Sequence, residues 1–128
     1  MSNKTIINTP LAPAPIGPYS QAIMVNNMLF ASGQIAIDPT NGNIVDKSIE
    51  EETHQVMKNI KAILDEAKMS FDDVVKTSIF LSDMDFFSKV NDTYGKYFNG
   101  NYPSRETIAV KTLPKNVNVE ISITAIKS

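Results

Sequence analysis

Arg105 is the only arginine in 128 residues, and the other basic residues, apart from His54, are all lysines. It stands in the stretch Tyr102–Val110, two residues after Pro103. A guanidinium group presents a rigid fork of N–H donors that matches a carboxylate with two parallel bonds, and lysine cannot copy this geometry. The consistent use of lysine elsewhere favours a specific role for Arg105 in holding an anion. A surface arginine, or an ion pair with the adjacent Glu106, is the alternative that composition leaves open.

Glu120 is the only acidic residue after Glu106, and it falls in the middle of a strand-like run. A carboxylate in that position could act as a general base on water. The plainer interpretation of the pattern alone is a solvated residue on the polar face of a strand.

The sequence indicates no metal or cofactor site. A metal site needs several ligands, whereas His54 is the only histidine and cysteine is absent. We interpret His54 as a helix-flank residue. The run Glu50–Glu52 is typical of the first turn of a helix, where acids complement the positive end of the helix dipole. The segment 32–34, SGQ, resembles no phosphate-binding loop.

Composition restricts the class of protein. The net charge is −2 and the pI about 5.3, so there is no basic footprint for nucleic acid. No run approaches the length of a membrane span, and the first residues lack the apolar core of a secretion signal. We therefore expect a cytoplasmic protein with no nucleic-acid or membrane partner. Its length predicts one domain, residues 1–128.

Strand and turn signals dominate the first 47 residues. Prolines at 10, 13, 15 and 18 predict an extended arm across the surface. The runs 21–25 and 28–37 are rich in β-forming residues, and Asn26-Asn27 between them predicts a tight hairpin. The segment 38–42, DPTNG, predicts a further turn.

Two helices alternate with strands in the remainder. Ser48 with Glu51 fits a capping box, and apolar residues then recur at helical spacing as far as Ala67. A strand is predicted over 74–82. A second helix is expected to begin near Asp83 or Asp85 and to end at 99–100. Its predicted inner face carries four residues: Phe87, Val90, Tyr94 and Tyr97.

Two final strands are predicted at about 106–112 and 117–126. Val117, Val119, Ile121 and Ile123 should share one face of the last strand, with Glu120 on the other. The order favours an α+β fold, a single-layer mixed sheet with two helices on one face. Phe80 and Ile126 fall in register with polar residues, which suggests that another subunit covers the far face. Further polar positions on that far face are Asn118, Ser122 and Thr124.

Five segments together resemble the RidA/YjgF family over nearly the whole chain. They occur in the family's order, which makes the resemblance far more specific than any single motif. The segments are 16–22 (IGPYSQA), 31–42 (ASGQIAIDPTNG), 90–94 (VNDTY), 102–110 (YPSRETIAV) and 113–121 (LPKNVNVEI).

The resemblance implies a chorismate-mutase-like fold that assembles as a homotrimer, with clefts between subunits and no metal or cofactor. It also implies hydrolysis of 2-imino acids, such as 2-iminobutanoate and 2-iminopropanoate, to 2-oxo acids and ammonia. A trimer that binds or senses small 2-oxo carboxylates without catalysis is the alternative. RNA cleavage, claimed for some relatives, is disfavoured by the acidic pI and the single arginine.

The resemblance also assigns roles to residues. Arg105 corresponds to the arginine that clamps the substrate carboxylate, and Glu120 to the glutamate that positions or activates water. Thr107 would contribute main-chain contacts, although many relatives carry cysteine there, so thiol-dependent properties are excluded. Glu106 replaces a small residue, but strand alternation should point it away from the pocket. Further cleft-lining positions are Tyr19, Ser32, Gly33 and Asn91.

Overall fold

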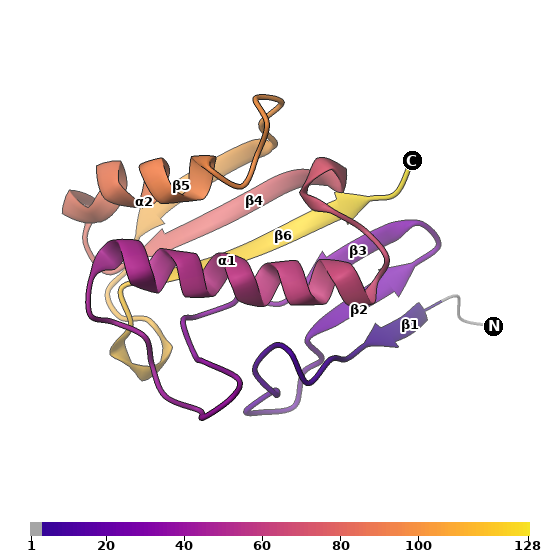
Figure 1. Ribbon diagram of the computed structural model, residues 1–128, viewed down its shortest axis with the longest axis horizontal. Helices are drawn as coiled ribbons and strands as arrows, with labels where there is room; N and C mark the ends of the chain where they lie inside the picture. The colour runs from indigo at the N-terminus through magenta and orange to yellow at the C-terminus, as the bar shows by residue number, and fades with distance from the viewer. Residues whose placement is uncertain (1–3) are drawn as a thin grey trace.

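The computed structural model describes residues 4–128, which form one six-stranded sheet with two α-helices on one face (Figure 1). The strand order is β1-β2-β3-β6-β4-β5. Strands β4 and β5 run parallel and the other neighbours antiparallel, so the expected α+β fold with a mixed sheet is confirmed. The elements are β1 Lys4–Ile7, β2 Ala22–Val25, β3 Met28–Ala31, α1 Ile49–Glu66, β4 Val74–Leu81, α2 Phe87–Gly95, β5 Ser104–Ala109 and β6 Val119–Ile126.

The helix α1 follows from its apolar spacing. All six residues of the predicted stripe are buried in the core between the helix and the sheet: Val56, Met57, Ile60, Ile63, Leu64 and Ala67. The Ser48 hydroxyl accepts from the Glu51 backbone N–H at 3.0 Å, which gives the cap bond of the expected capping box. A complete, reciprocal capping box forms instead at Ser70 and Asp73, before β4, where we did not predict one.

The second helix is shorter than predicted. A 3-10 turn, Met84–Phe86, leads into α2, which ends at Gly95 rather than at 99–100. The residues after Gly95 are held by contacts with other elements, because the Tyr97 hydroxyl forms a hydrogen bond with His54 and the Phe98 ring packs on Phe71. The position of His54 on the flank of α1 is confirmed.

The last strands also differ from the prediction at their starts. Strand β5 begins at Ser104, so Arg105 lies within the sheet rather than before it. Strand β6 alternates as predicted from Val119 onward, but Val117 lies before the strand and packs in a separate small cluster with Ile35 and Leu113. The 3-10 turn Pro114–Asn116 breaks the alternation there.

The N-terminal arm is tied to the sheet at both ends. Its first part pairs with β2 as strand β1, which the sequence did not predict. The buried Gln21 side chain then donates to the Thr9 and Pro13 carbonyls at 3.0 and 2.9 Å and accepts from the Thr9 N–H at 2.7 Å. One side-chain amide therefore fixes the path of the arm. Asn26 adopts φ 54°, which confirms the tight hairpin between β2 and β3.

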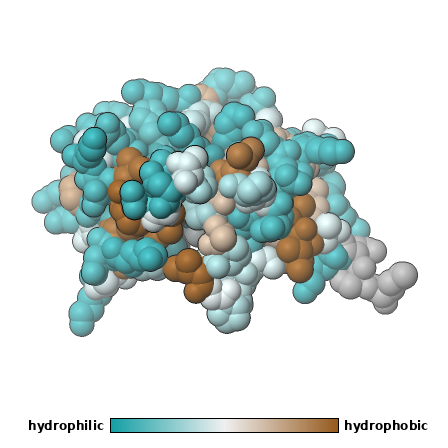
Figure 2. All heavy atoms as spheres, turned by 60° about the horizontal axis from the view of Figure 1, so that its bottom comes forward, coloured by the Kyte–Doolittle hydropathy of each residue, from teal (hydrophilic) through white to brown (hydrophobic). Residues whose placement is uncertain are grey.

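The sheet face opposite the helices keeps apolar side chains in contact with solvent. Phe30, Ile108 and Ile126 are 44%, 49% and 37% exposed there. Figure 2 shows the molecule tilted from the view of Figure 1, with its apolar side chains in several separate patches. Within residues 4–128, no helix has both the length and the apolar character needed to span a bilayer.

Candidate functional site

The register of β4 shows that Arg105 and Glu120 lie on opposite faces of the sheet. Thr77 of β4 pairs with Arg105 on one side, and Phe80 pairs with Glu120 on the other. Side chains alternate along a strand, so residues three apart point to opposite faces. Arg105 therefore faces the helices, and Glu120 faces away from them.

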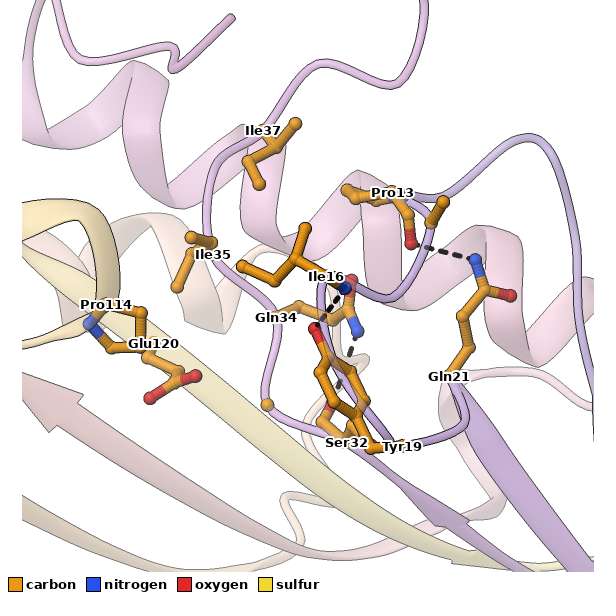
Figure 3. Close-up of a pocket in the computed structure, with 12 residues that line it drawn as sticks. Pro13, Ile16, Tyr19, Gln21, Ser32, Gln34, Ile35, Ile37, Pro114 and Glu120 are labelled. Atoms are coloured by element: carbon orange, nitrogen blue, oxygen red, sulfur yellow. Dashed lines mark hydrogen bonds between the residues drawn. The ribbon is translucent and has the colours of Figure 1, made fainter. Parts of the chain in front are cut away.

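Glu120 projects into a hollow of about 360 Å³ beneath the N-terminal arm, which we call the Glu120 hollow (Figure 3). Tyr19 and Glu120 are the only ionisable groups among the described residues that line it. Most of the remaining wall is apolar. The lining residues are Pro13, Ala14, Ile16, Tyr19, Gln21, Ser32, Gly33, Gln34, Ile35, Ile37, Pro114 and Glu120.

Gly33 allows the Glu120 side chain to lie against the backbone. A Cβ atom at position 33 would stand 2.7 Å from Glu120 Oε2 and 2.9 Å from its carboxyl carbon. Real Cβ contacts are essentially never this short, so only glycine fits without a shift of Glu120. Gly33, expected to line the cleft, thus lets the candidate base lie against its backbone.

The neighbouring polar side chains hold the wall of the hollow in place. The Ser32 hydroxyl donates to the Ser20 carbonyl at 2.6 Å, and the Tyr19 hydroxyl accepts from the Ile16 backbone N–H at 3.2 Å. In Figure 3 the Tyr19 ring and the Glu120 carboxylate approach the hollow from different elements, the arm and β6. Both residues could therefore contact one small molecule bound between them.

Burial changes the acidity of Glu120. The side chain loses water on one side without gaining a cation, and this desolvation raises the pKa of the carboxyl above its ordinary value. A carboxyl that titrates nearer to neutrality can both take a proton from water and return it to a leaving group.

Arg105 lies beside α2 in a second depression, which we call the Arg105 hollow. Its guanidinium carbon is 5.6 Å from the Phe87 ring centre and 5.3 Å from that of Tyr94. Its Nη1 donates to Asn91 Oδ1 at 2.7 Å. These three helix residues recur at spacings of four and three, so they share one side of α2. The lining residues are Asn91, Tyr94, Gly95, Tyr102, Pro103 and Arg105.

The guanidinium is aligned but its charge is not neutralised. Within residues 4–128 no carboxylate forms an ion pair with Arg105. Glu106 points to the other face of the sheet, where it accepts from the Ser78 hydroxyl and lies 3.6 Å from Lys76 Nζ. The ion pair between Arg105 and Glu106, left open by composition, is therefore wrong, and the expected outward direction of Glu106 is confirmed.

Tyr94 gives the Arg105 hollow a rigid floor. Its hydroxyl shares a 2.8 Å hydrogen bond with the buried Thr77 hydroxyl. Burial raises the pKa of the Tyr94 phenol, so the ring stays neutral beside the guanidinium. Thr107 lies further along the same face of β5, and its buried hydroxyl has no hydrogen-bond partner in the described part of the chain.

The seven predicted site residues thus fall into two groups within one chain. Tyr19, Ser32, Gly33 and Glu120 line the first hollow, whereas Asn91 and Arg105 line the second. Thr107 lines neither.

Sequence reasoning missed several wall residues. Phe87 and Tyr94 pack on the core as predicted, but their contacts with Arg105 were missed, although their spacing relative to Asn91 was a signal. Nothing in the pattern pointed to Gln21 or Gln34.

No group of three or more potential metal ligands occurs among residues 4–128. The arrangement offers an anion clamp and a proton acceptor, both made from side chains alone.

Comparisons with known proteins agree with the sequence motifs. A family model described as endoribonuclease L-PSP matches residues 9–127. A RutC family protein of Pyrococcus abyssi is 49% identical over 97% of this chain and 98% of its own length. Human 2-iminobutanoate/2-iminopropanoate deaminase is 42% identical over 97% of this chain and 90% of its own. The crystal structure of E. coli TdcF with bound serine is similar at a TM-score of 0.93, with 35% identity and coverage of 97% and 99%.

Proposed function

Because the chain belongs to the endoribonuclease L-PSP family, the RidA/YjgF family of its motifs, we propose that it hydrolyses small 2-imino acids to 2-oxo acids and ammonia. The relative named 2-iminobutanoate/2-iminopropanoate deaminase supplies the substrate class. The observation that carries the proposal is Arg105, whose guanidinium is oriented by Asn91 and two aromatic rings yet has no carboxylate partner among residues 4–128.

A 2-imino acid needs little more than these two groups. The Arg105 fork binds the substrate carboxylate, and each charge-assisted hydrogen bond contributes about 1.5–3 kcal/mol. Glu120 takes a proton from water as the water oxygen attacks the imine carbon, and this proton passes to the imine nitrogen, which gives a carbinolamine. Glu120 then takes the proton of the carbinolamine hydroxyl and passes it to the amino nitrogen, the C–N bond breaks, and ammonia leaves as the carbonyl forms. One water is consumed for each oxo acid and ammonia.

The opposite orientation of the two hollows means that one substrate can contact both groups only if a second subunit contributes one of them. Arg105 and Glu120 cannot meet one small substrate within one chain, because the sheet lies between them. In a cyclic trimer, each interface joins two different surfaces of neighbouring subunits. We propose that the Glu120 hollow of one subunit faces the Arg105 hollow of the next. The exposed Phe30, Ile108 and Ile126 would be covered in that assembly.

Subunit mixing tests both parts of this proposal. Glu120→Gln and Arg105→Ala are each expected to abolish most deaminase activity when assayed alone. In trimers reassembled from equal amounts, about a quarter of the interfaces should pair an intact Glu120 with an intact Arg105. Activity should therefore return to about a quarter of the wild-type value. The assay follows 2-oxobutanoate release from imine produced by a dehydratase, and each variant reassembled with itself is the control.

The outcomes separate the two parts. If the wild type is active but mixing the two variants restores no activity, the shared site is refuted and the deaminase activity stands. Stable monomers in sedimentation at micromolar concentration would also refute the shared site. A wild-type protein that does not accelerate imine hydrolysis would refute the enzyme.

The bound serine in the TdcF structure supports the alternative function, binding of small carboxylates without turnover. Calorimetry with 2-oxobutanoate distinguishes it, because a binder retains affinity in the absence of catalysis. The family description mentions ribonuclease activity, but a net charge of −2 gives this chain little attraction for RNA phosphates.

A further inference from the structure

Glu52 of α1 is a fully buried carboxylate that the mechanism above does not use. Among the described residues it is the only acid with no exposed surface. Its Oε2 accepts from the backbone N–H groups of Asn118 and Val119 at 2.7 and 3.1 Å, and its Oε1 accepts from Asn118 Nδ2 at 3.0 Å. All three glutamates of the run Glu50–Glu52 lie in the first turn of α1, as the helix-dipole interpretation predicted, and Glu52 in addition has specific hydrogen-bond partners.

The bonds to Glu52 satisfy backbone N–H groups at an edge of β6 where no neighbouring strand continues. Strands β3 and β6 pair as far as Phe30 and Thr124, and Gln34 then exchanges two backbone bonds with Ile121 at 2.8 and 3.1 Å. Two residues before Ile121, the Val119 N–H points to the same edge of β6, where no strand continues. Glu52 reaches down from α1 and accepts that N–H.

The segment that Glu52 holds follows a strained turn. Lys115 and Asn116 both have φ 56°, a left-handed conformation that residues with a side chain rarely adopt. Such a turn persists only where its surroundings determine it. Asn118 is fixed from the other side as well, because Ser82 Oγ donates to its Oδ1 at 2.9 Å and Ser82 N–H to its carbonyl at 3.0 Å.

We propose that Glu52 is a positioning residue for Glu120. It anchors the two residues that immediately precede Glu120, and so sets the point at which the Glu120 side chain enters its hollow against Gly33. Glu52 does not reach that hollow, because it lies on the helix side of the sheet. The catalytic part of this inference rests on the proposed deaminase function.

The test replaces Glu52 by its closest isostere. Glu52→Gln keeps the size but presents an amide N–H₂ to N–H donors. We expect kcat to fall about 10- to 100-fold, since a displacement of the order of 1 Å costs about that much. Affinity for 2-oxobutanoate should change little, because Arg105 lies on β5 and not on the segment that Glu52 holds. Thr53→Val is the matched control, as it removes the buried bond from Thr53 Oγ1 to the Ile49 carbonyl without touching β6.

A double variant shows whether Glu52 acts through Glu120. In the Glu120→Gln background, Glu52→Gln should still lower Tm but should cause no further loss of kcat. Equal, additive losses of kcat in both backgrounds would show that Glu52 only supports the fold.

The titration of the Glu120 carboxyl, followed by NMR, decides the point independently of activity. Glu52→Gln should return the pKa of Glu120 toward its ordinary value as water reaches the loosened strand start, whereas Thr53→Val should leave it unchanged. Tyr19 is the other ionisable group that faces Glu120 in the hollow, and neither variant alters it. An unchanged Glu120 titration in a folded Glu52→Gln protein would overturn the proposal.

If Glu52→Gln fails to fold, Asn118→Ala removes the Nδ2 bond to Glu52 and the Oδ1 bond to Ser82 but keeps both backbone N–H bonds to Glu52. It should give a smaller shift in the same direction, and no shift would refute the proposal. If the wild type proves not to be a deaminase, the proposed function fails, and the titration alone decides the role of Glu52.

Discussion

The Glu120 hollow and the Arg105 hollow hold their charged groups by different means. Glu120 leaves a central strand, lies against the Gly33 backbone, and is half-buried beneath an arm fixed by Gln21. Arg105 leaves the edge strand β5, is exposed, and is aligned only by side chains of α2. Main chain therefore fixes the candidate base, whereas side chains orient the candidate clamp. A base must meet one atom of the substrate, but a clamp can adjust to the carboxylate as it binds.

Glu120→Gln should separate the two hollows most strongly. The variant keeps the shape of the first hollow and removes its proton acceptor. We expect kcat to fall by about 10²–10⁴-fold, with 2-oxobutanoate binding largely retained because Arg105 is intact. Steady-state kinetics and calorimetry measure the two effects. An equal loss of 2-oxobutanoate binding would show that proton acceptance and carboxylate binding are not separated between the two hollows.

Arg105→Lys should have the next largest effect. The charge stays, but one of two charge-assisted bonds and the fixed orientation on Phe87 and Tyr94 are lost. We expect kcat/KM to fall about 10- to 100-fold without loss of the fold.

Lys61→Arg is the matched control, because Lys61 forms an exposed ion pair with Asp65 at 2.8 Å and such pairs contribute about 0–1 kcal/mol. Near-wild-type kinetics for Arg105→Lys would return this residue to the role of a surface arginine.

The two hollows each contain a glycine, and these should respond oppositely to alanine. Gly33→Ala places a Cβ 2.7 Å from Glu120 Oε2, so it should displace the carboxylate and lower kcat about 10-fold. Gly95 is the last residue of α2, and a Cβ atom there would meet nothing within 4 Å. Gly95→Ala should therefore raise the free energy of unfolding by up to about 1 kcal/mol. Kinetics and thermal unfolding of both variants check this. Similar effects at both positions would remove the contrast between main-chain and side-chain placement.

The smallest expected effect concerns stability and pH. Burial raises the pKa of Glu120 in the folded state above the ordinary value of 4.5, so the folded state binds its proton more tightly than the unfolded chain. The free energy of unfolding therefore falls as pH rises across the window from about 4.5 to the raised pKa. Glu120→Gln lacks this term. The Tm of Glu120→Gln minus that of the wild type should therefore increase, by a few degrees at most, from acidic to neutral pH. A decrease would contradict a raised pKa for Glu120.

Local patterns predicted local structure well. The spacing of Val56, Ile60 and Ile63 predicted α1, because one buried face is enough to specify an amphipathic helix. The alternation of Val119, Ile121 and Ile123 likewise predicted the inner face of β6.

What depended on strand order could not be predicted. Arg105 and Glu120 were expected in one site, and only the position of β4 between β5 and β6 shows that the sheet separates them. The partner of Glu52 lies 66 residues away in the chain, and no local pattern carries such information.

The central place of β6 has a consequence for biosynthesis. β6 is the last element in chain order, yet it lies between β3 and β4 and joins the N-terminal strands to the rest of the sheet. While residues 119–126 are still within the ribosome, β3 and β4 each expose an unpaired edge, and such edges recruit other chains. The nascent protein therefore has no complete sheet until its final strand emerges, and Glu120 arrives with that strand. A nascent chain whose residues 119–126 have not emerged therefore has no Glu120 in place to act as a base.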